Sequence, residues 1–163
     1  DDPAAHDPEA LQSTTPEADP TVSSADDTVE GTSIDRSAVT RLVLCSGKVF
    51  YDLAGSDLRA DARNVTIARL EELYPFPTSE IQELVARYPN LDEVVWVQEE
   101  PRNMGALAFV GPRLRTVVPR KVKLDYVTRP EHASTAEGKH IDHLVEQARI
   151  IREVLGGPAP DEA

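Results

Sequence analysis

The stretch RLVLCSGKVFYDL, residues 41–53, decides how this sequence folds. Residues 41–46 are a short apolar run that ends in a small polar residue, which is typical of a buried strand. Residues 47–58 then carry apolar side chains at helical spacing, which predicts a short helix. These apolar positions are Val49, Phe50, Leu53 and Leu58. A buried strand that leads directly into a helix indicates a β–α unit, because a parallel strand needs a crossover connection.

The same alternation continues along the chain. Three further apolar runs have the composition of strands: residues 65–70, 93–97 and 122–127. Helices are predicted from an N-cap at Thr78, within residues 104–118, and from an N-cap at Thr135. The last helix is expected to bury one apolar face, formed by Ile141, Leu144, Val145, Ala148, Ile151 and Leu155. The alternation predicts an α/β fold with three layers and a mostly parallel sheet of four to five strands.

Composition divides the chain into three parts. Residues 1–39 hold ten of the 29 acidic residues but only one of the 17 basic residues. Large apolar side chains are almost absent there, so we predict that residues 1–38 are a disordered acidic linker or tail. Residues 39–156 form the folded domain, and residues 157–163 are expected to be a flexible tail. No part of the chain concentrates basic residues, which argues against a nucleic-acid partner.

The sequence also indicates the cellular setting. Cys45 is the only cysteine, so no disulfide can form within the chain. The apolar runs are too short to span a bilayer, and no signal-peptide pattern is present, so no membrane partner is expected. The sequence does not begin with methionine. We interpret the chain as a piece of a longer, soluble, cytoplasmic protein.

Polar residues follow each of the four predicted strands. In open α/β sheets, ligands bind beyond the carboxyl ends of the strands. Five residues there are candidates for an anion site: Ser46, Lys48, Arg69, Gln98 and Arg129. Lysine and arginine suit phosphate and carboxylate groups. An alternative stays open, in which the same bases pair with Glu71, Glu99 and Glu100 in a salt network.

The other polar and aromatic residues give weaker indications of a functional site. His140 and His143 lack further ligands at metal-site spacing and are expected to be solvated or capping residues. Cys45 lies inside an apolar strand, which predicts a buried and inert thiol. Trp96 and Tyr126 are predicted core residues. No set of residues forms a complete catalytic constellation.

Four segments resemble those of one enzyme family, and they occur in the family's order. The family is the thiamine-diphosphate-dependent, decarboxylating component of 2-oxoglutarate dehydrogenase. The segments are LCSGKVFYDL (residues 44–53), RLEELYPFP (residues 69–77), WVQEEPRNMGA (residues 96–106) and the stretch from Arg129 to Gly138. His143 and the pair Glu146-Gln147 also fall where the family carries a histidine and a Glu-Gln pair. The resemblance covers roughly residues 40–155.

The resemblance implies a transketolase-like C-terminal domain of an oxidoreductase of the tricarboxylic acid cycle. The full enzyme uses thiamine diphosphate and Mg²⁺ to decarboxylate 2-oxoglutarate, and transfers the succinyl group to a lipoyl group of the succinyltransferase component. The two preceding domains hold the cofactor in a homodimer. Thiamine diphosphate needs a Gly-Asp-Gly stretch with a downstream asparagine, which this chain lacks. We therefore expect this segment alone to bind no cofactor and to be inactive.

The resemblance also implies a role for the candidate anion site. In the family this domain shapes the dimer and, in some members, binds an effector such as acetyl-CoA or AMP. Lys48 and Gln98 are the positions that the resemblance favours most, with Ser46, Arg69 and Arg129 as weaker candidates.

The chain departs from the family at two places near these residues. Residues 104–107 lack the usual glutamine and tryptophan, and Glu131-His132 replaces a shorter stretch of small residues. Two alternatives to the enzyme-domain interpretation stay open. One is a free-standing anion- or nucleotide-binding regulatory module, and the other is a purely structural dimerisation domain.

Overall fold

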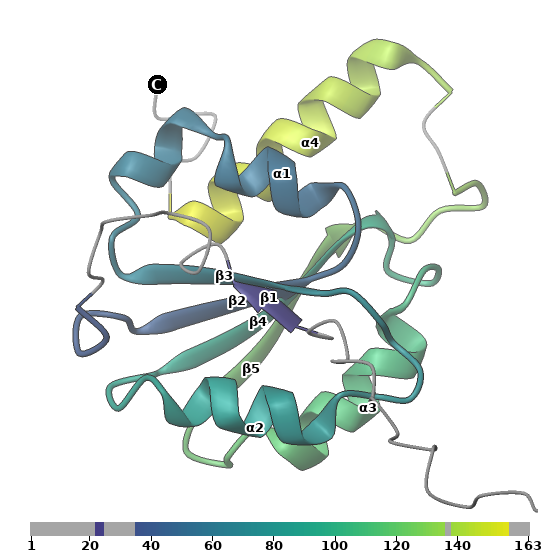
Figure 1. The fold of residues 1–163 in the computed structure, drawn as a ribbon. Helices are drawn as coiled ribbons and strands as arrows, with labels where there is room; N and C mark the ends of the chain where they lie inside the picture. Colours follow the sequence, from purple (N-terminus) through teal and green to yellow (C-terminus); the bar gives the residue numbers. More distant parts are fainter. Residues whose placement is uncertain (1–21, 25–34, 136–137, 157–163) are drawn as a thin grey trace, which may run out of the picture.

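The computed structural model describes residues 22–24, 35–135 and 138–156, which contain a five-stranded sheet. Its strands are β1 (Val22–Ser24), β2 (Arg41–Cys45), β3 (Val65–Leu70), β4 (Glu93–Pro101) and β5 (Lys123–Arg129). They lie in the order β1-β3-β2-β4-β5 (Figure 1). β2, β3, β4 and β5 pair in parallel, and β1 is antiparallel to β3. The predicted sheet, mostly parallel with four to five strands, is confirmed.

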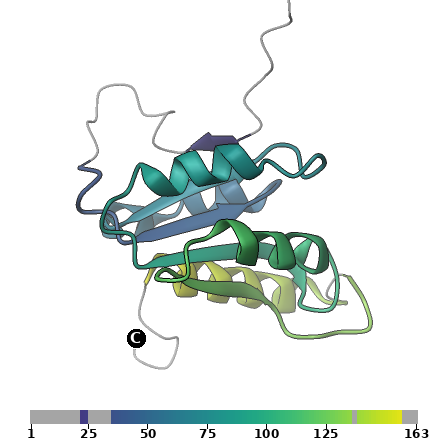
Figure 2. The same cartoon turned by 90° about the horizontal axis from the view of Figure 1, so that it is seen from below.

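Helices cover both faces of this sheet. The short helix α1 (Val49–Ala54), the 3-10 turn η1 (Asp57–Ala60) and the long helix α4 (His140–Leu155) lie on one face. Helices α2 (Thr78–Ala86) and α3 (Leu107–Val117) lie on the other (Figures 1 and 2). The three-layer prediction is confirmed. In the part of the chain that the structure describes, no helix is long and apolar enough to cross a membrane.

The inner strand β4 explains why both faces are covered. Its residues alternate between two apolar cores, because successive side chains of a strand point to opposite faces. Val94 and Trp96 pack in the core beneath α2 and α3, whereas Val95 and Val97 pack in the core beneath α1 and α4. A strand that is buried on both faces is a continuous apolar run, which is the pattern seen in the sequence.

The first strand was not predicted. It lies within residues 1–38, for which we expect disorder, and pairs Val22 with Leu70 and Ser24 with Ala68 of β3. Without this partner, β3 would be an edge strand with a free row of backbone N–H and C=O groups. The other parts of the predicted linker up to residue 34, and the predicted tail 157–163, lie outside the described residues.

Both predicted N-caps are wrong. Thr78 is already the first residue of α2, the cap position is Pro77, and the Thr78 hydroxyl donates to the carbonyl oxygen of Phe76 at 3.5 Å. Helix α4 begins at His140, five residues after Thr135. Local sequence offered plausible capping side chains at both places, but neither helix start is capped by a side chain.

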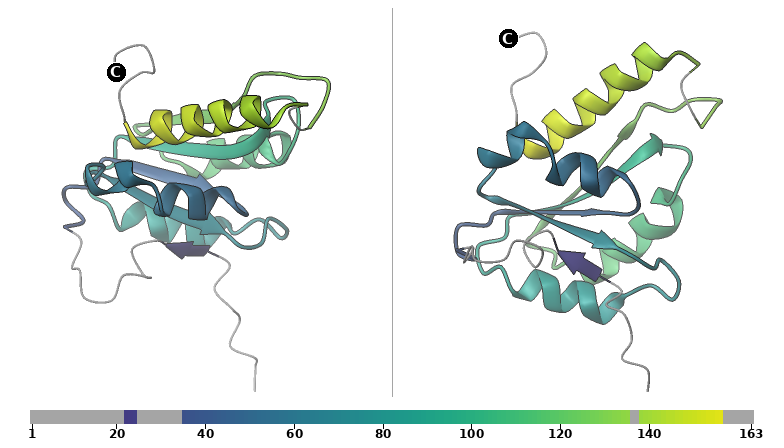
Figure 3. Two further views of the ribbon diagram at one scale, coloured as in Figure 1. Left: turned by 90° about the horizontal axis from the view of Figure 1, so that it is seen from above. Right: turned by 45° about the horizontal axis from the view of Figure 1, so that its top comes forward.

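The predicted apolar face of α4 is only half correct. The buried residues of α4 begin only at its eighth position, and they are Gln147, Ile150, Val154 and Leu155. Ile141, Leu144 and Val145 in the first half are instead exposed by 60, 49 and 60 %. The first half extends past the end of the sheet, so it has no sheet surface to cover (Figure 3).

Candidate functional site

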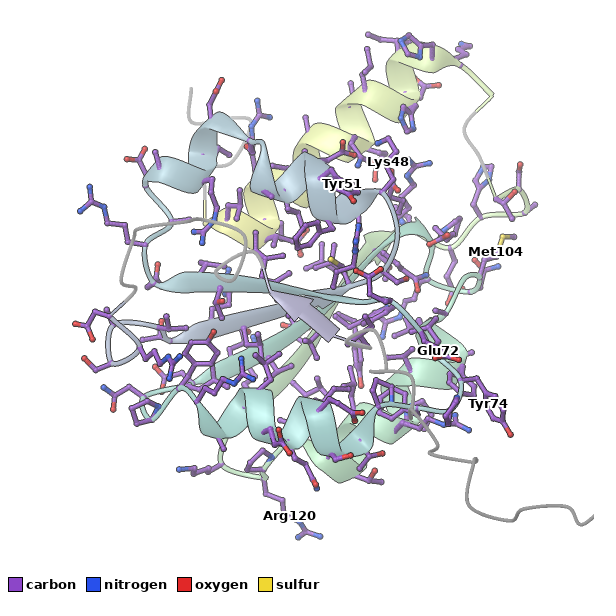
Figure 4. All side chains as sticks on the ribbon, viewed as in Figure 1. Lys48, Tyr51, Glu72, Tyr74, Met104 and Arg120 are labelled. Carbon is purple, nitrogen blue, oxygen red and sulfur yellow. The ribbon has the colours of Figure 1, made fainter. Side chains whose placement is uncertain are left out.

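The parallel strands bring the candidate residues to one edge of the sheet. Cys45 at the end of β2 is level with Arg69 of β3 and with Val97 of β4, and Val97 is level with Val127 of β5. The loops that follow these strands therefore lie at the same carboxyl edge. Lys48 and Tyr51 lie there at the start of α1, close to α4, and Met104 lies on the loop after β4 (Figure 4).

The five candidates nevertheless fall on two faces of the sheet. Gln98 follows Trp96 by two residues, so both side chains lie on the α2/α3 face. The hydrogen bond that the Trp96 indole nitrogen donates to the Gln98 side-chain oxygen confirms this. Arg69 and Arg129 belong to the α1/α4 face, because they follow Ile67 and Val127 by two residues. Gln98 is therefore separated from the basic residues by the sheet itself.

Gln98 has a structural role on its own face. Its side-chain amide nitrogen donates to the carbonyl oxygens of Met104 at 2.8 Å and Pro101 at 3.2 Å. Its oxygen accepts from the Trp96 indole nitrogen at 3.2 Å and from the Leu107 amide at 2.9 Å, at the first residue of α3. Gly105 closes the loop around it with φ of +66°, where a Cβ would lie 2.9 Å from the Gln98 nitrogen. Gln98, 3 % exposed, thus organises the β4–α3 loop and is not free to hold a ligand.

Lys48 is neutralised by neighbouring carboxylates. Its ammonium group forms an ion pair with Asp52, one helical turn later, and lies 3.7 Å from a carboxylate oxygen of Glu99. The hydrogen bond to Asp52, with the nearby charge of Glu99, raises the pKa of Lys48. The side chain is 65 % exposed, so this pair is a surface feature of modest energy.

Arg69 is also paired. Its Nε donates to Glu71 at 2.7 Å, and its guanidinium carbon lies 5.0 Å from the ring centre of Phe50 and 4.9 Å from that of Tyr51. Hydrogen bonds to Tyr51 and Glu71 raise the pKa of Arg69. The salt-network alternative therefore describes Lys48 and Arg69 in this chain, although the partners of Lys48 include Asp52, which was not predicted.

Arg129 differs from both. It is 5 % exposed, and within the described residues its guanidinium forms no ion pair with a carboxylate. Its Nη2 lies 2.8 Å from Nδ1 of His143 on α4, and its buried Nε has no partner. Because arginine has only donors, Nδ1 of His143 must accept, so the His143 ring is neutral with its proton on Nε2. Burying a cation without a counter-charge costs free energy, so Arg129 is a candidate for binding an anion that the chain itself does not supply.

A second buried polar group without a full set of hydrogen bonds lies on α4, the helix that carries His143. Gln147 donates from its amide nitrogen to Asp52 at 2.8 Å, which links α4 to α1, but its buried Oε1 accepts nothing. We call the set on this face the α4-side polar cluster. It consists of Lys48, Asp52, Glu99, Arg129, His143 and Gln147.

The bases on this face cannot all bind one small anion. Arg69 lies on β3 and Arg129 on β5, and β2 and β4 lie between them. Neighbouring strands are about 4.8 Å apart, so the two arginines sit on strands separated by roughly 14 Å. A single phosphate group reaches one of them, whereas a longer molecule with several anionic groups reaches both.

Sequence reasoning missed part of the cluster. His143 is half-buried against Arg129 rather than solvated or capping, and Gln147 and Asp52 were not predicted as site residues. Ser46 is half-buried at the expected edge. The spacing of His143, Gln147, Ile150 and Val154 was the available signal, because these residues share one helical face.

The remaining chemistry-bearing groups are inert. Burial raises the pKa of Cys45 to about 12, so its thiol stays protonated, as the sequence predicted for a buried cysteine. Trp96 is fully buried and Tyr126 packs against the same core, which confirms both predictions. Across residues 22–24, 35–135 and 138–156, no group of three or more His, Cys, Asp or Glu side chains could hold a metal ion.

Comparison with known proteins gives one consistent result. The sequence profile of the family described as "2-oxoglutarate dehydrogenase C-terminal" matches residues 21–155. The chain is 46 % identical over 127 residues to the 2-oxoglutarate dehydrogenase E1 component of Bacillus subtilis (strain 168), which covers 77 % of the chain and 14 % of that protein.

Two further relatives carry the same name. The protein of Geobacillus sp. (strain WCH70) is 44 % identical over 127 residues, 77 % of the chain and 13 % of the relative. That of Exiguobacterium sp. (strain ATCC BAA-1283 / AT1b) is 47 % identical over 119 residues, 72 % of the chain and 12 % of the relative. The chain thus spans only 12–14 % of the length of these three relatives.

Proposed function

Because the chain belongs to the family of 2-oxoglutarate dehydrogenase C-terminal domains, we propose that it is the terminal, non-catalytic part of such an enzyme. The enzyme decarboxylates 2-oxoglutarate with thiamine diphosphate and Mg²⁺ and passes the succinyl group to a lipoyl group of the succinyltransferase component. The observation that carries this proposal is the family match over residues 21–155, with 44–47 % identity to three proteins named as E1 components.

The cofactor belongs to the preceding part of the polypeptide in this proposal. A thiamine diphosphate site needs oxygen ligands for its metal ion and donors for the diphosphate. The described residues do not fit it, because no cluster of metal-binding side chains is present among them. We derive no catalytic step from this chain, and we assign it to the homodimer and to contacts with the domains that hold the cofactor.

The test compares two proteins under one set of conditions. The full-length protein that carries this segment should release CO₂ from 2-oxoglutarate when thiamine diphosphate, Mg²⁺ and an artificial electron acceptor are supplied. The 163-residue chain should release none under the same conditions. Cofactor-dependent turnover by the chain alone, or a full-length protein that leaves 2-oxoglutarate intact, would refute the assignment.

We also propose that the carboxyl edge on the α1/α4 face binds a nucleotide or acyl-CoA effector. Arg129 supports this, since its buried guanidinium has no carboxylate partner among the described residues and its buried Nε donor has no acceptor. Tyr51 adds an exposed aromatic ring beside Arg69, and aromatic rings stack on nucleotide bases. The roughly 14 Å between the strands that carry Arg69 and Arg129 suits an extended ligand rather than a free phosphate. Affinity should be modest, because part of the pocket would come from the preceding domains of the enzyme.

Calorimetric titration of the chain with AMP, acetyl-CoA and adenosine tests this second proposal. AMP or acetyl-CoA should give saturable heat, and adenosine should give none, because it lacks the anionic group that Arg129 recognises. If neither anion binds, or if adenosine binds as well as AMP, the edge is not an anion site.

A further inference from the structure

The first half of α4 exposes a row of apolar side chains. We call Ile141, Leu144 and Val145 the apolar stripe; they lie three and four residues apart and therefore share one side of the helix. They are 60, 49 and 60 % exposed. Apart from Tyr51 and Tyr74, they are the only exposed large apolar side chains in the described part of the chain.

The same half of the helix is thinly supported. The apolar residues of α4 that are buried, Ile150, Val154 and Leu155, all lie in the second half, against the sheet. The first half extends beyond the sheet edge (Figures 1 and 3). Exposed apolar side chains on a helix end that has no sheet beneath it indicate a missing neighbour.

A hollow borders the stripe. A cavity of about 310 Å³ is lined by Val145, Asp142 and Glu146 of α4 and by Pro130 and His132 of the loop after β5. Val145 thus belongs to both the stripe and the cavity. The surface offers apolar side chains beside a recess, and Asp142 adds a carboxylate to its rim, whereas Glu146 is already paired with Arg149 at 3.0 Å. The occupant should present an apolar side chain for the recess and a basic residue for Asp142.

We propose that the apolar stripe and this cavity are the docking surface for the polypeptide that precedes this segment in the full-length protein. The inference rests on the proposed function, because it takes the chain to be the terminal part of a longer enzyme. The length of the relatives points to this occupant. The three relatives devote 12–14 % of their length to the region that matches this chain, and the matching family is described as C-terminal. Most of the polypeptide therefore precedes this domain and is tethered next to it, at a high effective concentration.

Hydrogen exchange tests the proposal on the full-length protein and on this chain. The amides of residues 141–146 should exchange about tenfold or more slowly in the full-length protein than in the chain, because docking suppresses local opening of the helix. Helix α2, whose exposed side lacks large apolar residues, serves as the internal reference and should exchange equally in both. Equal exchange at residues 141–146 in the two proteins would overturn the proposal.

Substitutions in the full-length protein locate the contact. The double change Leu144→Ser and Val145→Ser should abolish the extra protection, whereas Arg152→Ser, at an exposed position of the packed half of α4, should preserve it. Protection that grows with the concentration of the isolated chain would instead assign the stripe to a second copy, which also overturns the proposal. The outcome is separate from that of the activity assay. If the full-length protein is active but residues 141–146 are not protected from exchange, only this inference is refuted. If these residues are protected but the protein is inactive, only the proposed function is refuted.

Discussion

Replacing Gln98 with alanine should destabilise the chain far more than an exposed substitution does. The change removes the acceptor for two donors, the Trp96 indole N–H and the Leu107 amide, and the donor for the Met104 and Pro101 carbonyls. A buried donor that loses its partner costs about 1–3 kcal/mol, so the two donors with the vacated volume give about 3–5 kcal/mol. A domain of this size has roughly 6–15 kcal/mol of stability, so the effect is large.

Urea unfolding measures this cost, and the chain carries its own probe. Trp96 is the only tryptophan, it is fully buried, and it contacts Gln98 directly. With a typical urea dependence of about 2 kcal/mol per molar, the midpoint should fall by roughly 2 M. The exposed Gln82→Ala on α2 is the matched control and should change stability by less than about 0.5 kcal/mol.

A second variant sharpens the test. Gln98→Glu keeps the shape but cannot donate to the two carbonyl oxygens when it is ionised, so burial should raise the pKa of the new carboxyl group in the folded state. The variant should then be least stable above that folded-state pKa, and its stability should recover as the pH falls from there to the ordinary glutamate pKa, because only the folded state binds the proton in that range. If Gln98→Ala unfolds within about 0.5 M urea of the native chain, the structural role of Gln98 is refuted.

Three further predictions concern the other polar groups. Since burial raises the folded-state pKa of Cys45 to about 12, only the thiol of the unfolded chain ionises between about pH 9 and 12. Over this range the free energy of unfolding should fall by about 1.4 kcal/mol per pH unit relative to that of Cys45→Ala. Equal pH dependence of the two proteins would contradict this. Lys48→Ala should lower stability by less than about 1 kcal/mol in urea titrations, because its ion pairs are exposed, and a larger loss would show that they are not. His143→Leu should cost about 2–4 kcal/mol, since the Arg129 guanidinium then loses Nδ1 of His143 as its acceptor, whereas His143→Gln should restore much of this; identical stability of the two variants would argue against the contact.

Much of the fold was accessible from the sequence because apolar runs carry the strand signal. The strand predicted at residues 65–70 has those bounds in the structure, and β2 differs from its prediction by one residue. The start of α2 was predicted to within one residue, but that of α4 was not, because capping depends on backbone geometry that a plausible threonine does not determine. The exposure of Ile141 and Leu144 depends on where the sheet ends beneath α4, which a helical pattern alone does not contain.

The sequence placed the candidate residues at one edge of the sheet but did not assign them to its two faces. Topology delivers Lys48, Arg69 and Arg129 to one edge, and the sequence showed this. The side of the sheet was also readable, since Gln98 follows the buried Trp96 by two residues, but grouping by edge alone ignored it. The pairing of Lys48 with Asp52 and the isolation of Arg129 depend on three-dimensional contacts between α1, β4, β5 and α4. They therefore had to come from the structure.

The most direct test of the proposed effector site compares three variants by AMP titration. Arg129→Gln should weaken binding by about 1.5–3 kcal/mol, which is roughly 10- to 150-fold in Kd, because it removes the base that lacks a carboxylate partner. Lys48→Ala should weaken it less than about fivefold, because Asp52 and Glu99 already compensate its charge. Arg120→Gln, on the far side of the molecule beyond α2 and α3 (Figure 4), controls for the loss of any positive charge and should bind as the native chain does. Unchanged binding by Arg129→Gln together with a large loss in Lys48→Ala would contradict the account.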